Sequence, residues 1–218
     1  MKSLRCTILG EGSSDAILVH PLRWLLAEAG VRRSVELAAA DLREWPRRTN
    51  SLADRIAAAI ALTEPCDLLF VHRDADGGEP TLRREEIDRA FRDACRSALG
   101  PQCVPVVPIR ETEAWFLFDE GALRSAAGNP RGSVLLGVPS PADLERLPDP
   151  KALLKDLLRL ATEFPPRRSR GFRPEAAIHR LAELVPDFSP LRRLSAFRTL
   201  EDEVRLLVGR HGWNLHPS

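Results

Sequence analysis

The stretch Leu68-Leu69-Phe70-Val71-His72-Arg73-Asp74-Ala75-Asp76-Gly77-Gly78 decides the fold, because in it two acidic residues follow an apolar run. The apolar run predicts a strand over 67–72. Alternate side chains of an extended segment point the same way, so Asp74 and Asp76 are expected to reach one metal ion. The alternative is an Asx-type turn that leads into the two glycines.

Two more acidic residues follow predicted strands. Glu11 comes after the apolar run 5–10, and Glu113 follows the run 103–109. In an open parallel sheet, ligands bind outside the carboxyl ends of the strands, where the strand order reverses. Carboxylates that meet there form an oxygen-only site suited to Mg²⁺ or Mn²⁺. Such a site indicates phosphodiester cleavage or transfer.

The first 110 residues alternate between strands and helices. We expect strands at 5–10, 34–39, 67–72 and 103–109, and helices at 14–30, 51–63 and 81–99. This order predicts an α/β, Rossmann-like parallel sheet of about four strands with right-handed crossovers. If the first and third strands are neighbours, Glu11 and the Asp74/Asp76 pair lie in one crevice.

The second half of the chain is loop-rich and then helical. The pattern predicts a short buried helix at 113–118 with Trp115 in the core, irregular structure at 126–150, an amphipathic helix at 151–162, a basic loop at 165–174, and helices at 175–184 and 189–208. We therefore expect a catalytic core over 1–120 and an extension over 121–218 that packs on it.

Composition narrows the class of protein. The 218 residues carry a net charge of +1, with −4 over residues 1–150 and +5 over residues 151–218. That split is typical of a metal nuclease with a separate phosphate-binding surface, or it is ordinary scatter. No apolar run approaches 18 residues and the N-terminus lacks a signal-peptide pattern, so we expect no membrane segment. Four scattered cysteines favour reduced thiols and a cytoplasmic protein.

Several functions are excluded by what the sequence lacks. There is no tyrosine, so tyrosyl transesterification is impossible. No GxxxxGK[ST] pattern is present, which excludes a P-loop ATPase. Haloacid-dehalogenase-type phosphatases and receiver domains carry key aspartates after the first strand, where this chain has Glu11.

Five motifs resemble one group of proteins. Glu11-Gly12 and Asp74-Ala75-Asp76 resemble the TOPRIM domain of topoisomerases, primases and OLD-type nucleases. The stretch 109–119 resembles the "I-E-A-W-hydrophobic-x-x-D" motif of the DUF4276 family of TOPRIM-like proteins. Residues 149–154 and 186–191 resemble that family's "P-K-x-L" and "S-F-x-x-L" segments. The resemblance covers most of the chain.

The resemblance implies a role for each acidic residue. Glu11 would transfer protons and contact a metal, Asp74 and Asp76 would bind Mg²⁺ or Mn²⁺, and Glu113 would complete a second metal position. Asp15 is a further candidate ligand, and its alternative role is to stabilise a helix N-terminus.

Basic residues are candidates for nucleic-acid binding. Arg73 and Arg110 would clamp a phosphate or neutralise the carboxylates beside them. The other candidates, Lys151, Arg167, Arg168, Arg170 and Arg173, would contact a nucleic-acid backbone, with a solvated loop as the alternative for the last four. His72 flanks the site and is interpreted as a structural histidine with satisfied hydrogen bonds.

Together these features predict a metal-dependent nuclease acting on DNA or RNA. By resemblance it would work beside an ABC- or SMC-type ATPase in prokaryotic anti-phage defence, and it could form a homo-oligomer. The alternatives are a non-catalytic subunit that binds the ATPase or nucleic acid, and a nucleotidyl or phosphoryl transferase.

Overall fold

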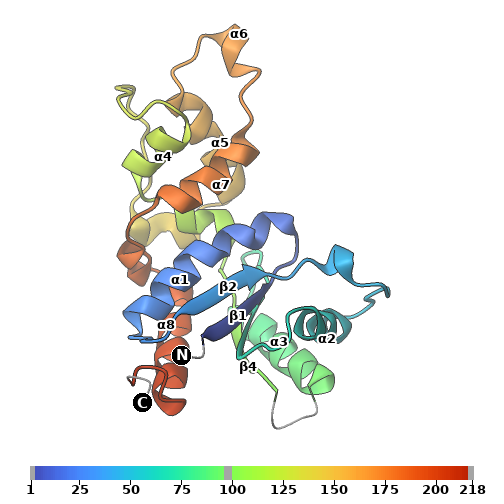
Figure 1. Cartoon of the computed structure of the whole chain (residues 1–218). Helices are drawn as coiled ribbons and strands as arrows, with labels where there is room; N and C mark the ends of the chain where they lie inside the picture. Colours follow the sequence, from blue (N-terminus) through green and yellow to red (C-terminus); the bar gives the residue numbers. More distant parts are fainter. Residues whose placement is uncertain (1–2, 96–99, 216–218) are drawn as a thin grey trace.

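The computed structural model describes residues 3–95 and 100–215, and its centre is one parallel four-stranded sheet (Figure 1). The strands are β1 (Leu4–Leu9), β2 (Val35–Ala39), β3 (Leu68–His72) and β4 (Gln102–Val106), in the order β2-β1-β3-β4. The predicted Rossmann-like α/β fold is thereby confirmed. Strands β1 and β3 are neighbours, as expected, with Ile8 opposite Phe70 and Leu9 opposite Val71. The strand order reverses between them, which places the switch point there.

Helices cover both faces of the sheet because strand side chains alternate between the faces. On one face, Leu69 and Val71 pack in a cluster with residues of α2 (Leu52–Leu62) and α3 (Pro80–Ala94). On the other face, Leu68 and Phe70 belong to a larger cluster that includes α1 (Val19–Glu28) and α8 (Ser195–Arg210). The result is a layer of helices on each side of a buried sheet.

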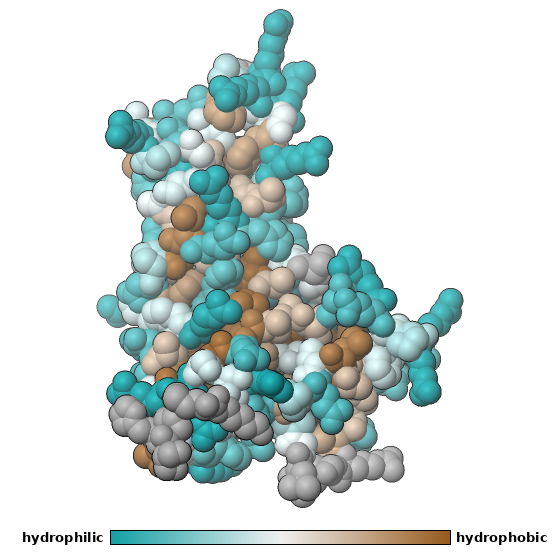
Figure 2. Space-filling model, in the orientation of Figure 1, coloured by the Kyte–Doolittle hydropathy of each residue, from teal (hydrophilic) through white to brown (hydrophobic). Residues whose placement is uncertain are grey.

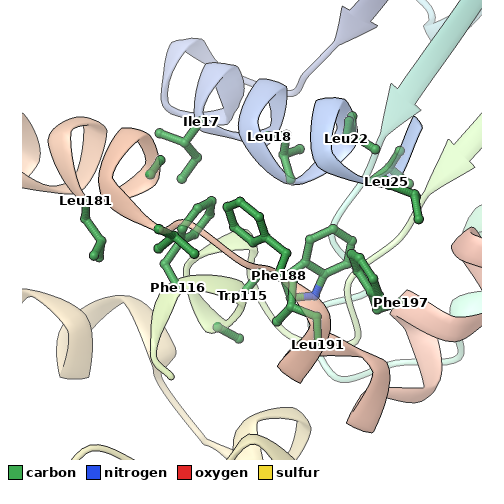
Figure 3. Packing of buried hydrophobic residues seen from close by; sticks show 14 of the residues in the cluster. Ile17, Leu18, Leu22, Leu25, Trp115, Phe116, Leu181, Phe188, Leu191 and Phe197 are labelled. Atoms are coloured by element: carbon green, nitrogen blue, oxygen red, sulfur yellow. The ribbon is translucent and has the colours of Figure 1, made fainter. Parts of the chain in front are cut away.

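The extension shares the larger of these two cores. Its regular elements are α4 (Glu120–Ala126), η4 (Pro141–Arg146), α5 (Pro150–Ala161), α6 (Pro166–Ser169), α7 (Pro174–Leu184), η5 (Ser189–Arg193) and α8. Trp115 packs edge-on against Phe197 at 5.3 Å between ring centroids, and Phe116 against Phe188 at 6.1 Å (Figure 3). Trp115 is 1% exposed, which confirms it as a core residue. A domain boundary near residue 120 stays a prediction.

Several predicted elements have other bounds or other geometry. The helix expected at 14–30 begins as a 3₁₀ helix, η1 (Ser13–Leu18), before α1. Helix α3 ends at Ala94 because Cys95 leaves helical backbone geometry, and residues 96–99 of the expected helix lie outside the described residues.

Two further corrections fall in the second half of the chain. The helix expected at 189–208 is interrupted at Leu194, whose extended backbone separates η5 from α8. The expected helix at 113–118 is the 3₁₀ helix η3 (Thr112–Phe116), and the basic loop at 165–174 contains the single turn α6.

Within residues 3–95 and 100–215, no helix combines the length and the apolar character needed to cross a lipid bilayer.

Candidate functional site

The loop after β1 is held by Asp15. Oδ2 of Asp15 accepts hydrogen bonds from the backbone N–H groups of Glu11 (2.7 Å) and Gly12 (3.0 Å). Nη2 of Arg55 donates to the carbonyl oxygen of Gly10 at 2.5 Å from the opposite side. The carboxylate of Asp15 therefore positions the turn that carries Glu11, which is the structural alternative to metal binding considered for this residue.

Asp74 is the electrostatic centre of the site. Its side chain is 19% exposed, and burial raises its pKa to about 8, helped by the negative charges of Asp15, Glu11, Glu113 and Asp76 in that order. The other four predicted carboxylates, at the ends of β1 and β3 and in the segment after β4, therefore all act on Asp74. The buried oxygen Oδ1 of Asp74 accepts no hydrogen bond within the described residues. A buried, unpaired carboxylate oxygen costs free energy unless a proton or a cation meets it.

His72 lies directly against this oxygen. Its Nε2 is 3.4 Å from Oδ1 of Asp74 and 3.8 Å from Oδ2 of Asp15. Nδ1 lies 3.1 Å from the Val106 carbonyl oxygen, which can only accept, so Nδ1 carries the proton. Burial lowers the pKa of His72, so the ring is neutral and its Nε2 accepts a hydrogen bond from the Thr112 hydroxyl at 3.0 Å. The structural interpretation of His72 agrees with these bonds, yet its ring also forms one wall of the site.

Asp76 does not lie in an extended segment. Its backbone φ is +51°, and it is the first residue of the turn that includes Gly77. Its side chain is 72% exposed, and its Oδ2 lies 3.8 Å from Nη2 of Arg83. The expectation that Asp74 and Asp76 point the same way is therefore wrong, because the chain leaves the strand in a left-handed turn. The turn forms at Asp76 and Gly77, where the two glycines predicted one. Asp76 contributes the weakest of the four negative charges that raise the pKa of Asp74.

Glu113 is buried and paired. Its side chain is 7% exposed, and Oε1 lies 3.0 Å from Nζ of Lys151 at the start of α5. Glu111, two residues earlier, accepts a hydrogen bond from the Lys151 backbone N–H at 3.1 Å. The extension is thereby fastened to the site, and a phosphate that contacted Lys151 would compete with Glu113 for it.

The two arginines proposed to flank the site take different positions. Nε of Arg73 donates to Oε1 of Glu11, and its Nη1 donates to Oε1 of Glu86 at 2.8 Å. Arg110 lies against the turn after Asp76, since a Cβ on Gly77 would come within 2.5 Å of its Nη1. The buried Nε of Arg110 has no hydrogen-bond partner among the described residues. Arg73 therefore neutralises a carboxylate, whereas Arg110 retains an unused donor.

The carboxylates suit a metal ion by their chemistry but not by their arrangement. In the described ranges 3–95 and 100–215, no three His, Cys, Asp or Glu side chains form a group that could hold a metal ion. Glu11 and Glu113 are instead paired with Arg73 and Lys151. The carboxylate oxygens of the site are nevertheless the ligands that Mg²⁺ and Mn²⁺ prefer. The Oδ1 atom of Asp74 has no hydrogen-bond partner among the described residues, and the negative charges of four other carboxylates act on Asp74. The donor set fits a hard cation, and its side chains are not pre-arranged as ligands.

A pocket of about 420 Å³ opens beside the carboxylates, in the range typical of small-ligand sites. Glu11 and Asp15 form one side of it, Asp41, Arg43 and Arg55 line its polar part, and apolar residues at the ends of β1 and β2 line the rest. A group bound there would contact the same Glu11 that faces Arg73.

The remaining basic candidates lie away from this site. Arg167 and Arg168 are in α6 and Arg170 follows it, and Figure 1 shows α6 at the end of the extension, beyond α5 and α7. The structure does not bring these residues to the carboxylates.

Sequence reasoning placed His72 beside the site but missed two contributors, the Thr112 hydroxyl and the Lys151–Glu113 ion pair. The position of His72 could be predicted because it is the last residue of a strand that ends at the switch point. No local pattern signals that Lys151 faces Glu113.

The chain was also compared with known proteins. The likeness to TOPRIM-like proteins rests on the sequence motifs alone. No family model, no curated protein and no solved structure matches this chain.

Proposed function

We propose that the carboxylate cluster at the ends of β1 and β3 is the active site of a nuclease that hydrolyses phosphodiester bonds with Mg²⁺ or Mn²⁺. One observation carries the proposal: the buried Oδ1 of Asp74 has no hydrogen-bond partner among the described residues, and burial, helped by four other carboxylates, raises the pKa of Asp74 to about 8. Proteins tolerate this repulsion at sites whose function needs it. A divalent cation relieves it and at the same time binds the negative oxygens of a phosphodiester.

Each residue has a role in the proposed reaction. Asp74 and Glu113 would hold the cation, with Asp76 reaching it only if its exposed side chain turns inward, and Asp15 positions the loop of Glu11. The bound cation would supply Lewis-acid activation of the phosphate. Water adds to phosphorus and loses a proton, one P–O ester bond breaks, and the departing oxygen gains a proton. Glu11, whose side chain is 39% exposed, would take the proton from the water and deliver it to the departing oxygen.

A second function is supported by the ion pairs. Glu11 pairs with Arg73 and Glu113 with Lys151, so the protein's own cations neutralise two of the five carboxylates. A subunit of this kind would bind nucleic acid or a partner ATPase without cleaving anything.

A third function is supported by the pocket beside Glu11. Its volume suits a nucleoside, so transfer of a nucleotidyl or phosphoryl group to a small substrate would use the same carboxylates. Turnover of free nucleotides without cleavage of nucleic acid would favour this function.

The partners of the protein are part of the proposal. Action beside an ABC- or SMC-type ATPase in the cytoplasm, in anti-phage defence, is supported by the motif resemblance only. Co-purification with the products of neighbouring genes, together with the mass of the native particle, tests both the ATPase partner and a homo-oligomer.

Cleavage assays on the purified protein test the proposed activity. Labelled DNA and RNA are incubated with Mg²⁺, Mn²⁺ or EDTA, using wild type, Asp74→Asn, and Asp93→Asn as the control on the exposed surface of α3. We expect cation-dependent cleavage by wild type and Asp93→Asn, and a loss of about 100-fold or more in Asp74→Asn. Cleavage by Asp74→Asn at the wild-type rate, or none by wild type with either cation, would overturn the proposal.

A further inference from the structure

A second hollow lies in the extension, away from the carboxylates. It encloses about 510 Å³ and is open to solvent. Its walls combine two half-buried phenylalanines, Phe164 and Phe172, with the three arginines Arg168, Arg173 and Arg180. Small residues of α4 and α7 also line it. The hollow is therefore open, partly aromatic and positively charged.

The arginines around this hollow are not neutralised by nearby acids. Five arginines fall within residues 167–180 against one acidic residue, Glu175, which pairs with Lys155. Within the described residues, none of the five forms an ion pair. The guanidinium of Arg168 lies over the ring of Phe164, with 4.1 Å between Cζ and the ring centroid. Figure 2 shows hydrophilic side chains projecting into solvent at this end of the molecule.

These features match one chemical class of ligand. Phosphates require cations, and unpaired bases require flat apolar or guanidinium surfaces on which to stack. A stacked base in a duplex exposes no such face, whereas a single strand exposes one at every nucleotide. An acidic peptide would use the arginines but would leave the two phenylalanines without a role.

We infer that the hollow formed by Phe164, Phe172, Arg168, Arg173 and Arg180 binds a single-stranded segment of nucleic acid, with a base in the hollow and phosphates on the arginines. The inference deepens the proposed function, because it names single strands as the substrate class. Arg168 and Arg173 are candidates for nucleic-acid binding from the sequence alone, whereas Phe164, Phe172 and Arg180 are added by the structure.

Binding is measured without cleavage. Fluorescence anisotropy in EDTA follows labelled single strands and the matching duplex across a series of salt concentrations. The triple variant Arg168→Ala/Arg173→Ala/Arg180→Ala tests the contribution of charge. Phe172→Leu removes the aromatic ring but keeps an apolar side chain, so it tests stacking. Phe172→Trp keeps an aromatic ring and should bind as wild type does. Arg198→Ala, an exposed arginine of α8 outside the hollow, is the control.

We expect wild type to bind single strands more tightly than duplex. Phe172→Leu should lose about 5- to 100-fold in affinity with an unchanged salt dependence, as one lost stacking contact implies. The triple variant should lower the slope of log K against log salt by about 2, at roughly 0.7 per phosphate contact. Arg198→Ala should match wild type.

Equal affinity of wild type, Phe172→Leu and the triple variant, or a preference for duplex, would overturn the inference. Asp74→Asn separates this result from the proposed function, because it should bind single strands as wild type does and fail only in cleavage. If the hollow variants lose binding while wild type never cleaves, single-strand binding by the hollow is supported and the nuclease proposal is rejected. If wild type and the triple variant cleave single strands at equal rates and bind them with equal affinity, only the proposal about the hollow is rejected.

Discussion

Nζ of Lys151 lies 3.0 Å from Oε1 of Glu113, so the first turn of α5 supplies a cation to the acidic site at the edge of the sheet. The hydrogen bond to Glu113 is the main cause of a raised pKa of Lys151, so its ammonium group stays charged. The extension is thus an electrostatic part of the site as well as a neighbour of the sheet. This pair also gives the first test of whether a cation can occupy the site.

Replacing Lys151 with Met should destabilise the protein and strengthen its response to a divalent cation. The change leaves Glu113, which is 7% exposed, without its partner and beside Asp74. We expect a loss of roughly 1–3 kcal/mol in the free energy of unfolding in EDTA, and a larger rise in Tm on adding Mn²⁺ than in wild type. Thermal unfolding with and without Mn²⁺ measures both effects.

Lys155→Met is the matched control, because Lys155 lies on the same helix as Lys151 and pairs with the exposed Glu175 of α7. Its Tm and its response to Mn²⁺ should stay near those of wild type. Equal Mn²⁺ shifts in wild type and Lys151→Met would show that Glu113 does not take part in cation binding.

Replacing Gly10 with Ala should disrupt the loop that carries Glu11. A Cβ on Gly10 would lie 2.7 Å from Cβ of Asp15 and 3.2 Å from the Gly12 carbonyl oxygen, neither of which can move freely. At Gly12, two residues later, the nearest atom is Oγ of Ser14 at 3.8 Å. We therefore expect Gly10→Ala to cost about 1–3 kcal/mol and Gly12→Ala to be nearly neutral in urea unfolding. Similar costs for both would mean that the contact between Gly10 and Asp15 is looser than the structure has it.

Much of the fold follows from short-range patterns. The apolar runs before Glu11 and Asp74 form β1 and β3, and the alternation of strands and helices implies a parallel sheet. The position of Glu11 and Asp74 on one edge follows from that topology. These inferences succeed because the period of side chains and the end of a strand are local properties.

What failed depended on backbone detail or on long-range contacts. Asp76 was expected to share the direction of Asp74, but its φ of +51° turns the chain, and spacing alone does not reveal a left-handed residue. The ion pair of Lys151 with Glu113 was not expected either, while contact of Lys151 with nucleic acid stays a prediction. No local signal pairs residues that only tertiary packing brings together.

Replacing Asp74 with Asn should stabilise the protein at alkaline pH when divalent cations are absent. The folded-state pKa of about 8 lies above the ordinary value of 3.8, so between these values the folded protein binds more protons than the unfolded chain. The stability that the protonated form contributes is present below about pH 4 and is lost as pH rises through 8. Asn carries no charge, so at pH 9 we expect Tm to exceed that of wild type by at least about 2–4 °C, with the gap closing toward pH 5.

Thermal scans from pH 5 to 9 in EDTA measure this gap. Asp93→Asn should follow wild type at every pH, since Asp93 is exposed on α3. Adding Mg²⁺ at pH 9 should stabilise wild type and leave Asp74→Asn unchanged. A gap that is constant with pH would mean that Asp74 titrates normally.

Replacing Glu11 with Gln separates an enzyme from a subunit that only binds. Gln keeps the size of the side chain and an oxygen that can accept the hydrogen bond from Arg73, but it cannot carry a proton to the departing oxygen. If Glu11 is the acid/base group, cleavage should fall by roughly 10²–10⁴-fold while the affinity for single strands in EDTA changes by no more than a few-fold. Glu86→Gln removes the charge of the second partner of Arg73 at a residue with no proposed role, so it should retain activity.

If both variants lose activity equally, Glu11 acts by orienting Arg73. If wild type and Glu11→Gln cleave equally well, proton transfer by Glu11 is rejected and the ion pair with Arg73 becomes its function, as expected of a subunit that binds its strand without cutting it.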